Sequence, residues 1–457
     1  MSFKLSIAHF TAALTVLLAA TIAIMDPLAS DKSSAALALT VLTIGFWASG
    51  IIAEYLAALL FFTLAMLFAI VPAEVAFAGF SAGATWLIFS GLVFGVAVNT
   101  SGLGERIARR LSSLFGRSYR RIIFGIILVT LVLGFVMPSS IGRVMLVIPI
   151  AIALAKELGY ETGSRGYAGI VLAAGFGCFF MPYGILPANI PNVVLLGIAE
   201  RLYDFTPVYG EWFALHFPLI SVFKAPILWA LVITLFPASS RPTTTAGEQG
   251  PMSRTEWRVA AILLAALLGW ATDFLHQVSP AWIGMAAAML CMAPGLGNVT
   301  KKDFGNINFS VLFYVAAILG IGAMVNHSGL GTIVAEQMMA LLPLAPGQTF
   351  INFMSIALTG VAVGTFTAAP GVPIIMTPIA PALAEGSGFS LDAVLMIQAL
   401  SFSTPYLVYQ SAPIVVAMGM TGVRLADGTK LIALLALVTI VVIFPLDYVW
   451  WQLLGWF

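Results

Sequence analysis

A single arginine stands inside an otherwise apolar stretch of the chain. Positions 137–150 read MPSSIGRVMLVIPI, so Arg143 follows a Pro-Ser-Ser break and precedes a long apolar run. A guanidinium keeps its charge in proteins, and a charge at the centre of a bilayer costs at least about 2.5–3.5 kcal/mol, so it needs a partner or a cavity. Our working hypothesis is a counter-charge for an anion, because the guanidinium fork fits carboxylate or sulfonate groups. The alternatives are a buried pair with a carboxylate such as Glu54, or donation to carbonyl groups of the hairpin that contains Arg143.

Proline, glycine and small polar residues interrupt four apolar stretches, which read PSSIGR (138–143), LPANIPN (186–192), TAAPG (367–371) and YQSAP (409–413). A membrane tolerates irregular backbone only where protein or a water-filled cavity satisfies it, and paired interruptions indicate a transport site. Capping of helix ends is the competing interpretation for the short polar side chains. We predict these substrate-binding residues: Ser139, Ser140, Arg143, Asn189, Asn192, Thr367 and Ser411. The candidates for binding a cation are Ser139, Ser140, Asn189 and Thr367.

The ionisable side chains that catalysis needs do not gather at any usable spacing. Cys178 and Cys291 lie in apolar segments and are expected to behave as small hydrophobes. The histidines are scattered, at His9, His216, His276 and His327. We therefore expect no enzyme, no catalytic residues, no cofactor and no metal site other than one for sodium.

The composition places the chain in a membrane. It has 457 residues, of which 61% are hydrophobic and 9% charged, and its mean hydropathy is +1.04. Apolar runs of about 20 residues, the length of a membrane span, recur from end to end. We expect an all-α polytopic membrane protein with about eleven transmembrane helices and two re-entrant hairpins. The first apolar segment is long and is expected to be a helix rather than a signal peptide. The net charge of +1 gives no reason to expect a nucleic-acid partner.

Three sequence blocks recur in the same order. NTSGLG (99–104) pairs with NHSGLG (326–331), GRVMLVIPIAIALAKELGY (142–160) with GVPIIMTPIAPALAEGSGF (371–389), and MPYGILPANIPNVVLLG (181–197) with TPYLVYQSAPIVVAMG (404–419). Asn99 and Asn326 are expected to end helices rather than to bind a ligand. The chain is thus divided into a first repeat half, an inter-repeat linker and a second repeat half, at 1–240, 241–256 and 257–457.

Charge placement predicts how the halves sit in the membrane. With the N-terminus in the cytoplasm, Lys and Arg collect on that side, except for Lys32 and Arg201 outside and Arg143 and Lys224 within apolar runs. Lys224 is expected to extend to the outer interface. The basic loop after the first SGLG and the uncharged loop after the second then face opposite sides, which predicts an inverted repeat in the inner membrane.

Each half is expected to contain one hairpin and one broken helix. The first hairpin, about 119–157, would open to the cytoplasm, and the second, about 347–386, to the outside. The broken helices are predicted at about 165–199 and 393–420, and their half-helix ends could face an anion with N–H groups.

The segment AFAGFSAGATWLIFSGLVFGVAVNTSGLGERIARRL (76–111) resembles the signature region of the divalent anion–sodium symporter family. The resemblance runs through nearly the whole chain. It implies a homodimer with scaffold and mobile transport domains, an elevator motion, and hairpin tips and turns that bind sodium ions and substrate carboxylates. PSSIGR is similar to the Pro-Ser-Asn-Thr-Ala-Arg tip of the branch with citrate and dicarboxylate exchangers, and Arg143 falls on its arginine.

The hairpin tips depart from the family pattern. Ser139-Ser140-Ile141 and Ala368-Ala369-Pro370 stand where the family has Ser-Asn-Thr. The leading hypothesis is a secondary active transporter that moves a small divalent anion, a dicarboxylate, sulfate or related ion, by an elevator mechanism. The alternative is an exchanger or proton-coupled carrier of another small organic anion with little sodium dependence. Sodium is the candidate coupling ion, and the expected partners are the anion, the lipid bilayer and a second copy of the chain.

Overall fold

All regular elements in the described part of the chain are helical. The computed structural model describes residues 7–28, 31–104, 106, 118–137, 139–239, 250–276, 278–330, 333, 337, 341–365 and 367–457. The first half carries α1 (Ile7–Met25), α2 (Asp31–Ser49), α3 (Glu54–Leu67), α4 (Ala73–Ala76), α5 (Ala78–Ser81), α6 (Gly83–Ser101), α8 (Tyr119–Val136), α9 (Ser140–Glu157), α10 (Arg165–Phe180), η1 (Met181–Gly184), η2 (Leu186–Ala188), α11 (Ile190–Tyr203), α12 (Tyr209–His216), η3 (Phe217–Phe223) and α13 (Lys224–Leu235).

The second half carries a similar series: α14 (Arg254–Ala271), α15 (Asp273–His276), α16 (Pro280–Met292), α17 (Lys301–Gly305), α18 (Ser310–His327), α20 (Thr349–Val363), α21 (Gly371–Met376), α22 (Ala380–Ser387), α23 (Leu391–Phe402), η4 (Val408–Gln410), α24 (Ala412–Thr421), α25 (Leu425–Val438), η5 (Thr439–Ile443) and α26 (Phe444–Leu453). In each half the last long helix contains a π-helical segment, η3 or η5.

Six helical segments of the described chain are long and apolar enough to cross a membrane: Gly83–Ser101, Tyr119–Val136, Arg165–Gly184, Tyr209–Leu235, Ser310–His327 and Leu425–Leu453. Shorter apolar helices accompany them, α1 among them. The expectation of a multi-pass helical membrane protein is therefore confirmed. The total of about eleven spans and the two re-entrant hairpins stay predictions.

The repeated NxSGLG motif builds the same helix-ending turn twice. After α6, Gly102 has φ 81° and its N–H donates to the Asn99 carbonyl at 3.3 Å. After α18, Gly329 has φ 75° and donates to the Asn326 carbonyl at 3.2 Å. Glycine adopts this left-handed conformation without a Cβ clash, which explains why the motif needs glycine there.

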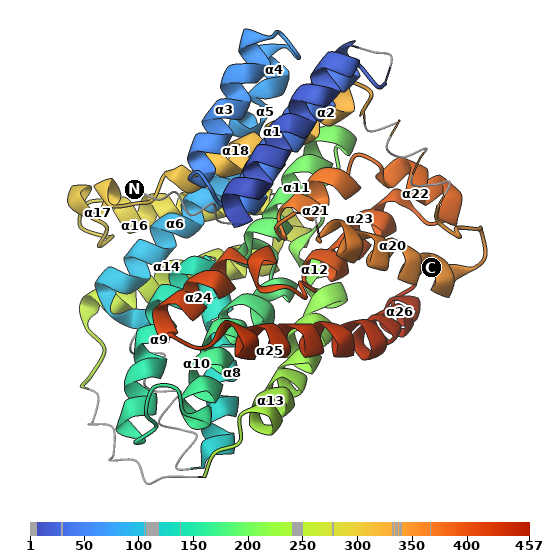
Figure 1. Ribbon diagram of the computed structural model, residues 1–457. Helices are drawn as coiled ribbons and strands as arrows, with labels where there is room; N and C mark the ends of the chain where they lie inside the picture. Colours follow the sequence, from blue (N-terminus) through green and yellow to red (C-terminus); the bar gives the residue numbers. More distant parts are fainter. Residues whose placement is uncertain are drawn as a thin grey trace, which may run out of the picture.

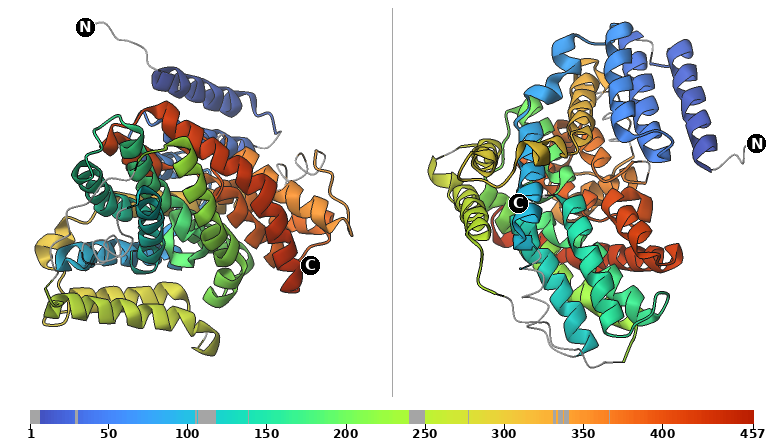
Figure 2. Two further views of the ribbon diagram at one scale, coloured as in Figure 1. Left: turned by 90° about the horizontal axis from the view of Figure 1, so that it is seen from below. Right: turned by 90° about the vertical axis from the view of Figure 1, so that its left-hand side faces the viewer.

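The helices form two groups that face each other (Figure 1). The first group contains α1–α6 together with α14–α18, and α18 packs on α3, α4 and α5 while α16 packs on α6. The second group contains α8–α13 and α20–α26. Each group thus takes helices from both repeat halves. The views in Figure 2 show α1 at the edge of the molecule, where it packs on α2.

Both helices that were expected to be broken are interrupted. Between α10 and α11 the chain forms the short 3-10 turns η1 and η2, and between α23 and α24 it forms η4. The hairpin segments are also present as helix pairs: α8 and α9 flank the first tip, and α20 and α21 flank the second.

Several predicted features fall outside the described residues. They are Lys4, Pro138 of the first tip, the basic residues within 107–117, and most of the linker, at 241–249. Within the remainder of the linker, Ser253 and Glu256 form a capping box that begins α14 at Arg254.

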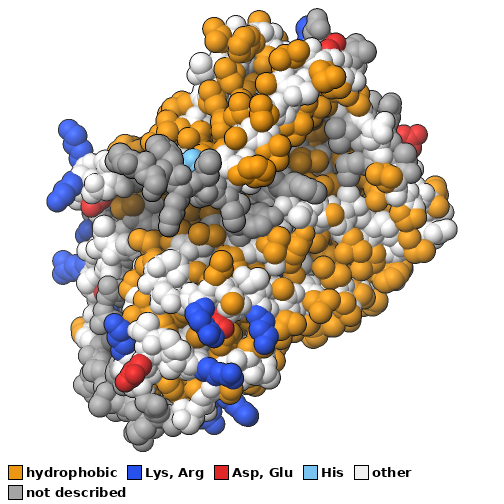
Figure 3. Space-filling model, viewed as in Figure 1, with side chains coloured by type: hydrophobic (Ala, Val, Ile, Leu, Met, Phe, Trp, Pro, Cys, Tyr) orange, Lys and Arg blue, Asp and Glu red, His pale blue; other side chains and the backbone are white. Residues whose placement is uncertain are grey.

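The surface is apolar across the middle of the face drawn in Figure 3. Lys and Arg gather over the lower part of that face and along its left edge, near α17. Large exposed apolar side chains, such as Leu17, Leu67, Leu264 and Leu453, fit contact with lipid.

Candidate functional site

A cavity of about 520 Å³ lies between the two groups of helices. Both hairpin tips, both helix breaks and the helices α6 and α18 line it. Its size falls in the range of small-molecule sites, and its walls are mostly apolar with a few polar side chains. Segments that lie more than 200 residues apart in sequence therefore meet at one site.

Arg143 lies directly behind the first tip and is fully buried. Its guanidinium donates to the Cys178 carbonyl at 3.0 and 3.1 Å, to the Ala188 carbonyl at 3.1 and 3.2 Å, and to the Met137 carbonyl. It does not line the cavity. All these acceptors are neutral backbone carbonyls, so Arg143 is not paired with Glu54. Met137 belongs to the hairpin, whereas Cys178 of α10 and Ala188 of η2 belong to the first broken helix, so the alternative of donation to hairpin carbonyls is met by Met137 alone.

The same guanidinium also fixes two side chains that do line the cavity. Arg143 Nη2 donates to Ser140 Oγ at 2.9 Å and to Asn189 Oδ1 at 3.1 Å. Ser140 Oγ in turn donates to Asn189 Oδ1. With its oxygen engaged twice, the Asn189 Nδ2 amide has no partner within the described part of the chain, although the residue is only 1% exposed. A buried N–H donor that lies beside a cavity and has no protein acceptor is suited to bind an oxygen atom of a ligand.

Ser139 and Asn192 support the backbone of the site. Ser139 caps α9, and its Oγ accepts from Gly142 N at 3.1 Å. Asn192 Nδ2 donates to the carbonyls of Tyr183 at 2.9 Å and Ile185 at 3.1 Å, which holds the first break open. Ser139 lines the cavity, whereas Asn192 lies behind it.

In the second half, Gln410 joins the hairpin tip to the helix break, as Arg143 does in the first half. Ala369 N donates to the Gln410 carbonyl at 2.8 Å, which ties the second tip to the second break. Gln410 Oε1 accepts from the backbone N–H groups of Tyr406 and Leu407 at 2.8 Å, and its Nε2 donates to the Gly364 carbonyl at 2.5 Å. The interpretation of the sequence missed Gln410, although an amide beside Ser-Ala-Pro is a signal for a satisfied turn.

The other two predicted residues of the second half differ in position. Ser411 lines the cavity and caps α24, with its Oγ accepting from Ile414 N at 3.3 Å. Thr367 is 2% exposed and lies outside the cavity wall, and its Oγ1 has no protein partner. The structure thus brings Ser139, Ser140, Asn189 and Ser411 together at the cavity and leaves Arg143, Asn192 and Thr367 one layer behind.

The opposite wall comes from the first group of helices. It presents Glu54 at the start of α3, Asn99 near the end of α6, and Asn306, Asn308 and Tyr314 around the start of α18. Asn99 was expected only to end a helix, yet it also faces the cavity. Asn326, its counterpart in the repeat, does not line it.

Helix ends supply the electrostatics of the cavity. Ser139, Asn189 and Ser411 are the N-caps of α9, α11 and α24, and residues of the first turn of each helix line the wall. Each helix N-terminus carries about half a positive elementary charge. Among the lining residues that the structure describes, Glu54 is the sole charged side chain. The end of the cavity at the tips therefore attracts anions without a lysine or arginine in the wall.

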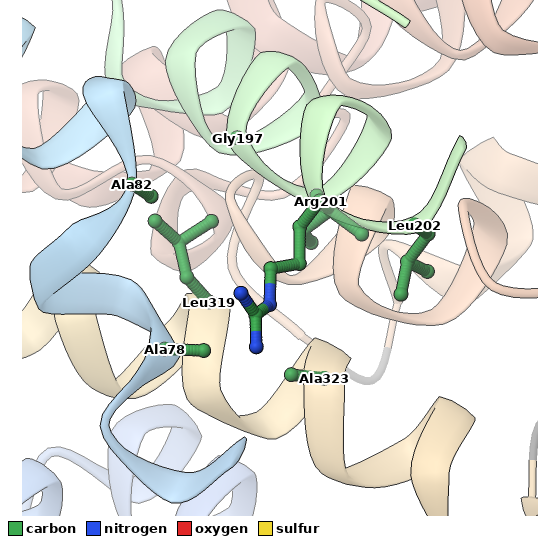
Figure 4. Close-up of a pocket in the computed structure, with 8 residues that line it drawn as sticks. Ala78, Ala82, Gly197, Arg201, Leu202, Leu319 and Ala323 are labelled. Atoms are coloured by element: carbon green, nitrogen blue, oxygen red, sulfur yellow. The ribbon is translucent and has the colours of Figure 1, made fainter. Parts of the chain in front are cut away.

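A second cavity, of about 10 Å³, lies between α11, α5 and α18 (Figure 4). It has room for about one water molecule, so it is too small for an organic anion. Arg201 reaches into it between Ala78, Leu319 and Ala323. A Cβ added at Gly197 would lie 2.7 Å from the Ala84 Cβ and 2.9 Å from Leu319 Cδ2, so small residues let α11 approach the first group closely.

A family model described as the sodium:sulfate symporter transmembrane region matches residues 4–457. Inner membrane protein YbhI of Escherichia coli is 26% identical over 402 residues, which cover 83% of this chain and 82% of that protein. A membrane protein of Cupriavidus necator is 29% identical over 269 residues, 56% of this chain and 52% of that protein. The L-tartrate/succinate antiporter of Escherichia coli is 24% identical over 273 residues, 56% of this chain and 54% of that protein. The alignments with the last two relatives span about half of their length.

Two solved transporters share the fold. The YdaH transporter of Alcanivorax borkumensis, described as having an unusual topology, gives a TM-score of 0.55 at 15% identity and covers 86% of this chain and 89% of its own. MtrF of Neisseria gonorrhoeae, described within a class of antimetabolite efflux pumps, gives a TM-score of 0.52 at 13% identity, with 82% and 83% covered. At these identities the likeness concerns the fold alone.

Proposed function

The chain belongs to the sodium:sulfate symporter transmembrane family, and on that premise we propose that it exchanges small dicarboxylate anions across the inner membrane by an elevator-type motion. The resemblance found in the sequence is confirmed, because the family model spans residues 4–457. The family and the relatives with descriptive names are transporters rather than enzymes. The L-tartrate/succinate antiporter supports C4 dicarboxylates as the first substrates to test.

The proposal rests above all on the side-chain amide of Asn189, the N-cap of α11. Its Nδ2 is buried with no partner in the described residues, and the N-termini of α9, α11 and α24 surround the same end of the cavity. A carboxylate placed there would accept from Asn189 and would be stabilised by the helix ends. Glu54 on the opposite wall repels an anion, which favours binding at the tips.

The residues of the first half do not fit a sodium ion. The carbonyls of Met137, Cys178 and Ala188 converge with Ser140 Oγ and Asn189 Oδ1, and all five oxygens accept from the Arg143 guanidinium. These oxygens are what a hard cation would need, and a fixed positive charge already engages them. In the second half, Thr367 Oγ1 is the remaining side-chain oxygen among the predicted cation ligands. This distribution supports exchange with little sodium dependence over sodium symport.

Replacing Asn189 by aspartate tests the proposed anion site. Asn189→Asp keeps an oxygen for Arg143 and Ser140 but puts a carboxylate oxygen where Nδ2 would donate. Hydrogen bonds to charged groups contribute about 1.5–3 kcal/mol, so we expect succinate binding to weaken roughly tenfold or more, as measured by isothermal titration calorimetry. Asn326→Asp adds the same charge to a residue outside the cavity and should leave affinity unchanged. Equal succinate affinity in both variants and the unsubstituted protein would contradict the site.

A further inference from the structure

Three ionisable side chains are fully buried in one cluster behind the helix breaks. They are Lys224 at the start of α13, Asp447 in α26 and His216 at the end of α12, each 0% exposed. None of them lines the 520 Å³ cavity. The cluster lies beside η3 and η5, the two π-helical segments, which contact each other. π-helical segments often occur at functional sites.

Lys224 contacts both broken helices. Its Nζ donates to the carbonyl of Ser403, the residue that ends α23, at 3.2 Å. It also lies 5.5 Å from the ring centre of Phe180, the last residue of α10. The expectation that Lys224 extends to the outer interface is therefore wrong, because the ends of these two half-helices hold it inside. A helix C-terminus carries partial negative charge and favours a cation at this place.

Asp447 and His216 have no hydrogen-bond partners among the residues that the structure describes. Both carboxylate oxygens of Asp447 and both ring nitrogens of His216 are buried and unpaired there. His216 lies between two indole rings, with centroid distances of 4.4 Å to Trp212 and 5.6 Å to Trp451. Lys224 and Asp447 attract each other through space but are not hydrogen-bonded. Leaving a buried carboxylate ionised without a direct partner is costly, so one proton changes the free energy of this cluster strongly.

Few other ionisable groups face the cluster. Tyr183 of η1 is buried on one of the elements packed against the cluster, and its hydroxyl has no partner among the described residues. Arg143 lies beyond Tyr183 and is close enough to interact with it electrostatically. Tyr119 at the start of α8 instead donates to the Phe236 carbonyl, at the opposite end of α13. Tyr448 follows Asp447 in the middle of α26 and is half-buried, and its hydroxyl is hydrogen-bonded to Thr349 Oγ1 and accepts from Gln452 Nε2. The remaining titratable or charged residues of these elements, including α14 and α15 beside α12, lie toward helix ends or are exposed: Arg120, Arg121, Arg165, Tyr167, Cys178, Tyr209, Glu211, Arg254, Glu256, Arg258, Asp273, His276, Asp392, Asp427 and Lys430.

We propose that Lys224 and Asp447 form a proton-binding site whose occupancy is coupled to the anion in the cavity, an inference that rests on the proposed transport function. A proton from solvent adds to the Asp447 carboxylate while Lys224 remains an ammonium. The cluster then changes from a neutral pair of opposite charges to a net charge of +1.

The two breaks connect the cluster to the anion site. The C-terminal ends of α10 and α23 contact Lys224, and the N-termini of their continuations, α11 and α24, line the cavity. Ser221 of η3 accepts from Gly184 N at 3.0 Å, and Trp212 Nε1 donates to the Tyr183 carbonyl at 3.3 Å. The segments α12 and η3, which lead into Lys224, therefore also hold the first break. A positive charge behind the breaks favours an anion in front of them. By reciprocity, the anion must then favour binding of the proton.

Counterflow in proteoliposomes tests the coupling. Vesicles loaded with succinate are diluted into radiolabelled succinate, with and without an inwardly directed proton gradient. We expect the gradient to speed uptake several-fold in the unsubstituted protein. Asp447→Asn should keep counterflow without a gradient and lose the stimulation, whereas Glu211→Gln, at an exposed carboxylate on α12, should keep both. Equal stimulation in Asp447→Asn, or none in the unsubstituted protein, would overturn the proton site.

A second measurement does not depend on transport. Infrared difference spectra between acidic and neutral pH should show the C=O band of a protonated buried carboxyl, and added succinate should extend this band to higher pH. The band should disappear in Asp447→Asn and shift in Asp447→Glu, which serves if the asparagine variant fails to fold. A spectrum without this band, or a band unchanged in both variants, would overturn the proposal. Loss of succinate counterflow alongside an intact, pH-dependent band would instead contradict the proposed substrate.

Discussion

At the scale of single residues, the site separates the groups that face an anion from the charge that positions them. Arg143 donates to three backbone carbonyls and presents Asn189 and Ser140 to the cavity, while remaining out of the wall itself. We therefore regard Arg143 as a positioning residue.

Removing Arg143 should affect folding and transport together. Arg143→Gln leaves several buried carbonyls without donors, each at a cost of about 1–3 kcal/mol, so the midpoint of thermal unfolding in detergent should fall markedly. Arg143→Lys should recover only part of the stability, because an ammonium cannot reproduce the fork. Arg121→Gln, at an exposed arginine, is the matched control and should match the unsubstituted protein. A normally stable Arg143→Gln that fails only in succinate counterflow would restore the direct counter-charge role.

The residue types and the interrupted apolar stretches predicted which positions belong to the site, but not which atoms contact each other there. The Pro-Ser-Ser context identified Ser139 and Arg143, and Ser139 caps α9 by accepting from Gly142 N, as the capping interpretation expected. Ser411 caps α24 by accepting from Ile414 N, although it was predicted only as a substrate-binding residue. The burial of Lys224 was not predictable, because its contacts come from Ser403, 179 positions away, and from Phe180.

At the scale of elements, each half uses a different device for the same task. Arg143 joins the first tip to the first break, and Gln410 joins the second tip to the second break. The repeat was readable in the sequence because its turns need glycine and proline. The use of the Gln410 amide in place of a guanidinium was not readable in the sequence, because Arg143 lies in a tip whereas Gln410 lies in a break.

Another element contact joins the halves at the predicted cytoplasmic surface. Arg106, after α6, forms an ion pair with Glu256 in the first turn of α14 at 2.6 Å and donates to the carbonyls of Gly250 and Pro251. The Arg106 hydrogen bond, assisted by Ser253, lowers the pKa of Glu256 to about 2. The stabilisation by this pair is thus present above the ordinary glutamate pKa and is lost as pH falls toward 2.

Thermal unfolding in detergent against pH should show this loss. Glu256→Gln should unfold at a lower temperature than the unsubstituted protein above about pH 5, and the difference should shrink as pH falls below that value. Asp427→Gln removes a carboxylate whose arginine partner, Arg424, is exposed, and should give a smaller difference at every pH. A difference between Glu256→Gln and the unsubstituted protein that grows on acidification would show that the pair does not stabilise the fold.

At the scale of the whole molecule, the two groups of helices enclose a cavity that both repeat halves line. Composition and apolar runs predicted the helical membrane class, and the repeat predicted that both halves contribute to the site. The cavity itself could not be predicted, because Glu54, Asn99 and Tyr314 reach it through packing between distant helices. The elevator motion and the homodimer stay predictions.

The inverted arrangement of the hairpins predicts opposite labelling at their open ends. A cysteine at the exposed Glu161 should react with an impermeant maleimide only from the cytoplasmic side, and one at the exposed Gln348 only from the outer side. The native Cys178 and Cys291 are both fully buried and provide little background. Labelling of both introduced cysteines from the same side would exclude hairpins that open to opposite faces.

Exchange of a dicarboxylate without sodium is the central property proposed for this transporter, and counterflow measures it most directly. Proteoliposomes loaded with succinate should accumulate external radiolabelled succinate or L-tartrate at the same rate when sodium is replaced by choline at constant ionic strength. Asn189→Asp should abolish most of this accumulation, and Asn326→Asp should not. Uptake that requires sodium and rises steeply with its concentration would contradict the account, because it would mean that both halves bind a cation in spite of Arg143 and the Ala-Ala-Pro tip.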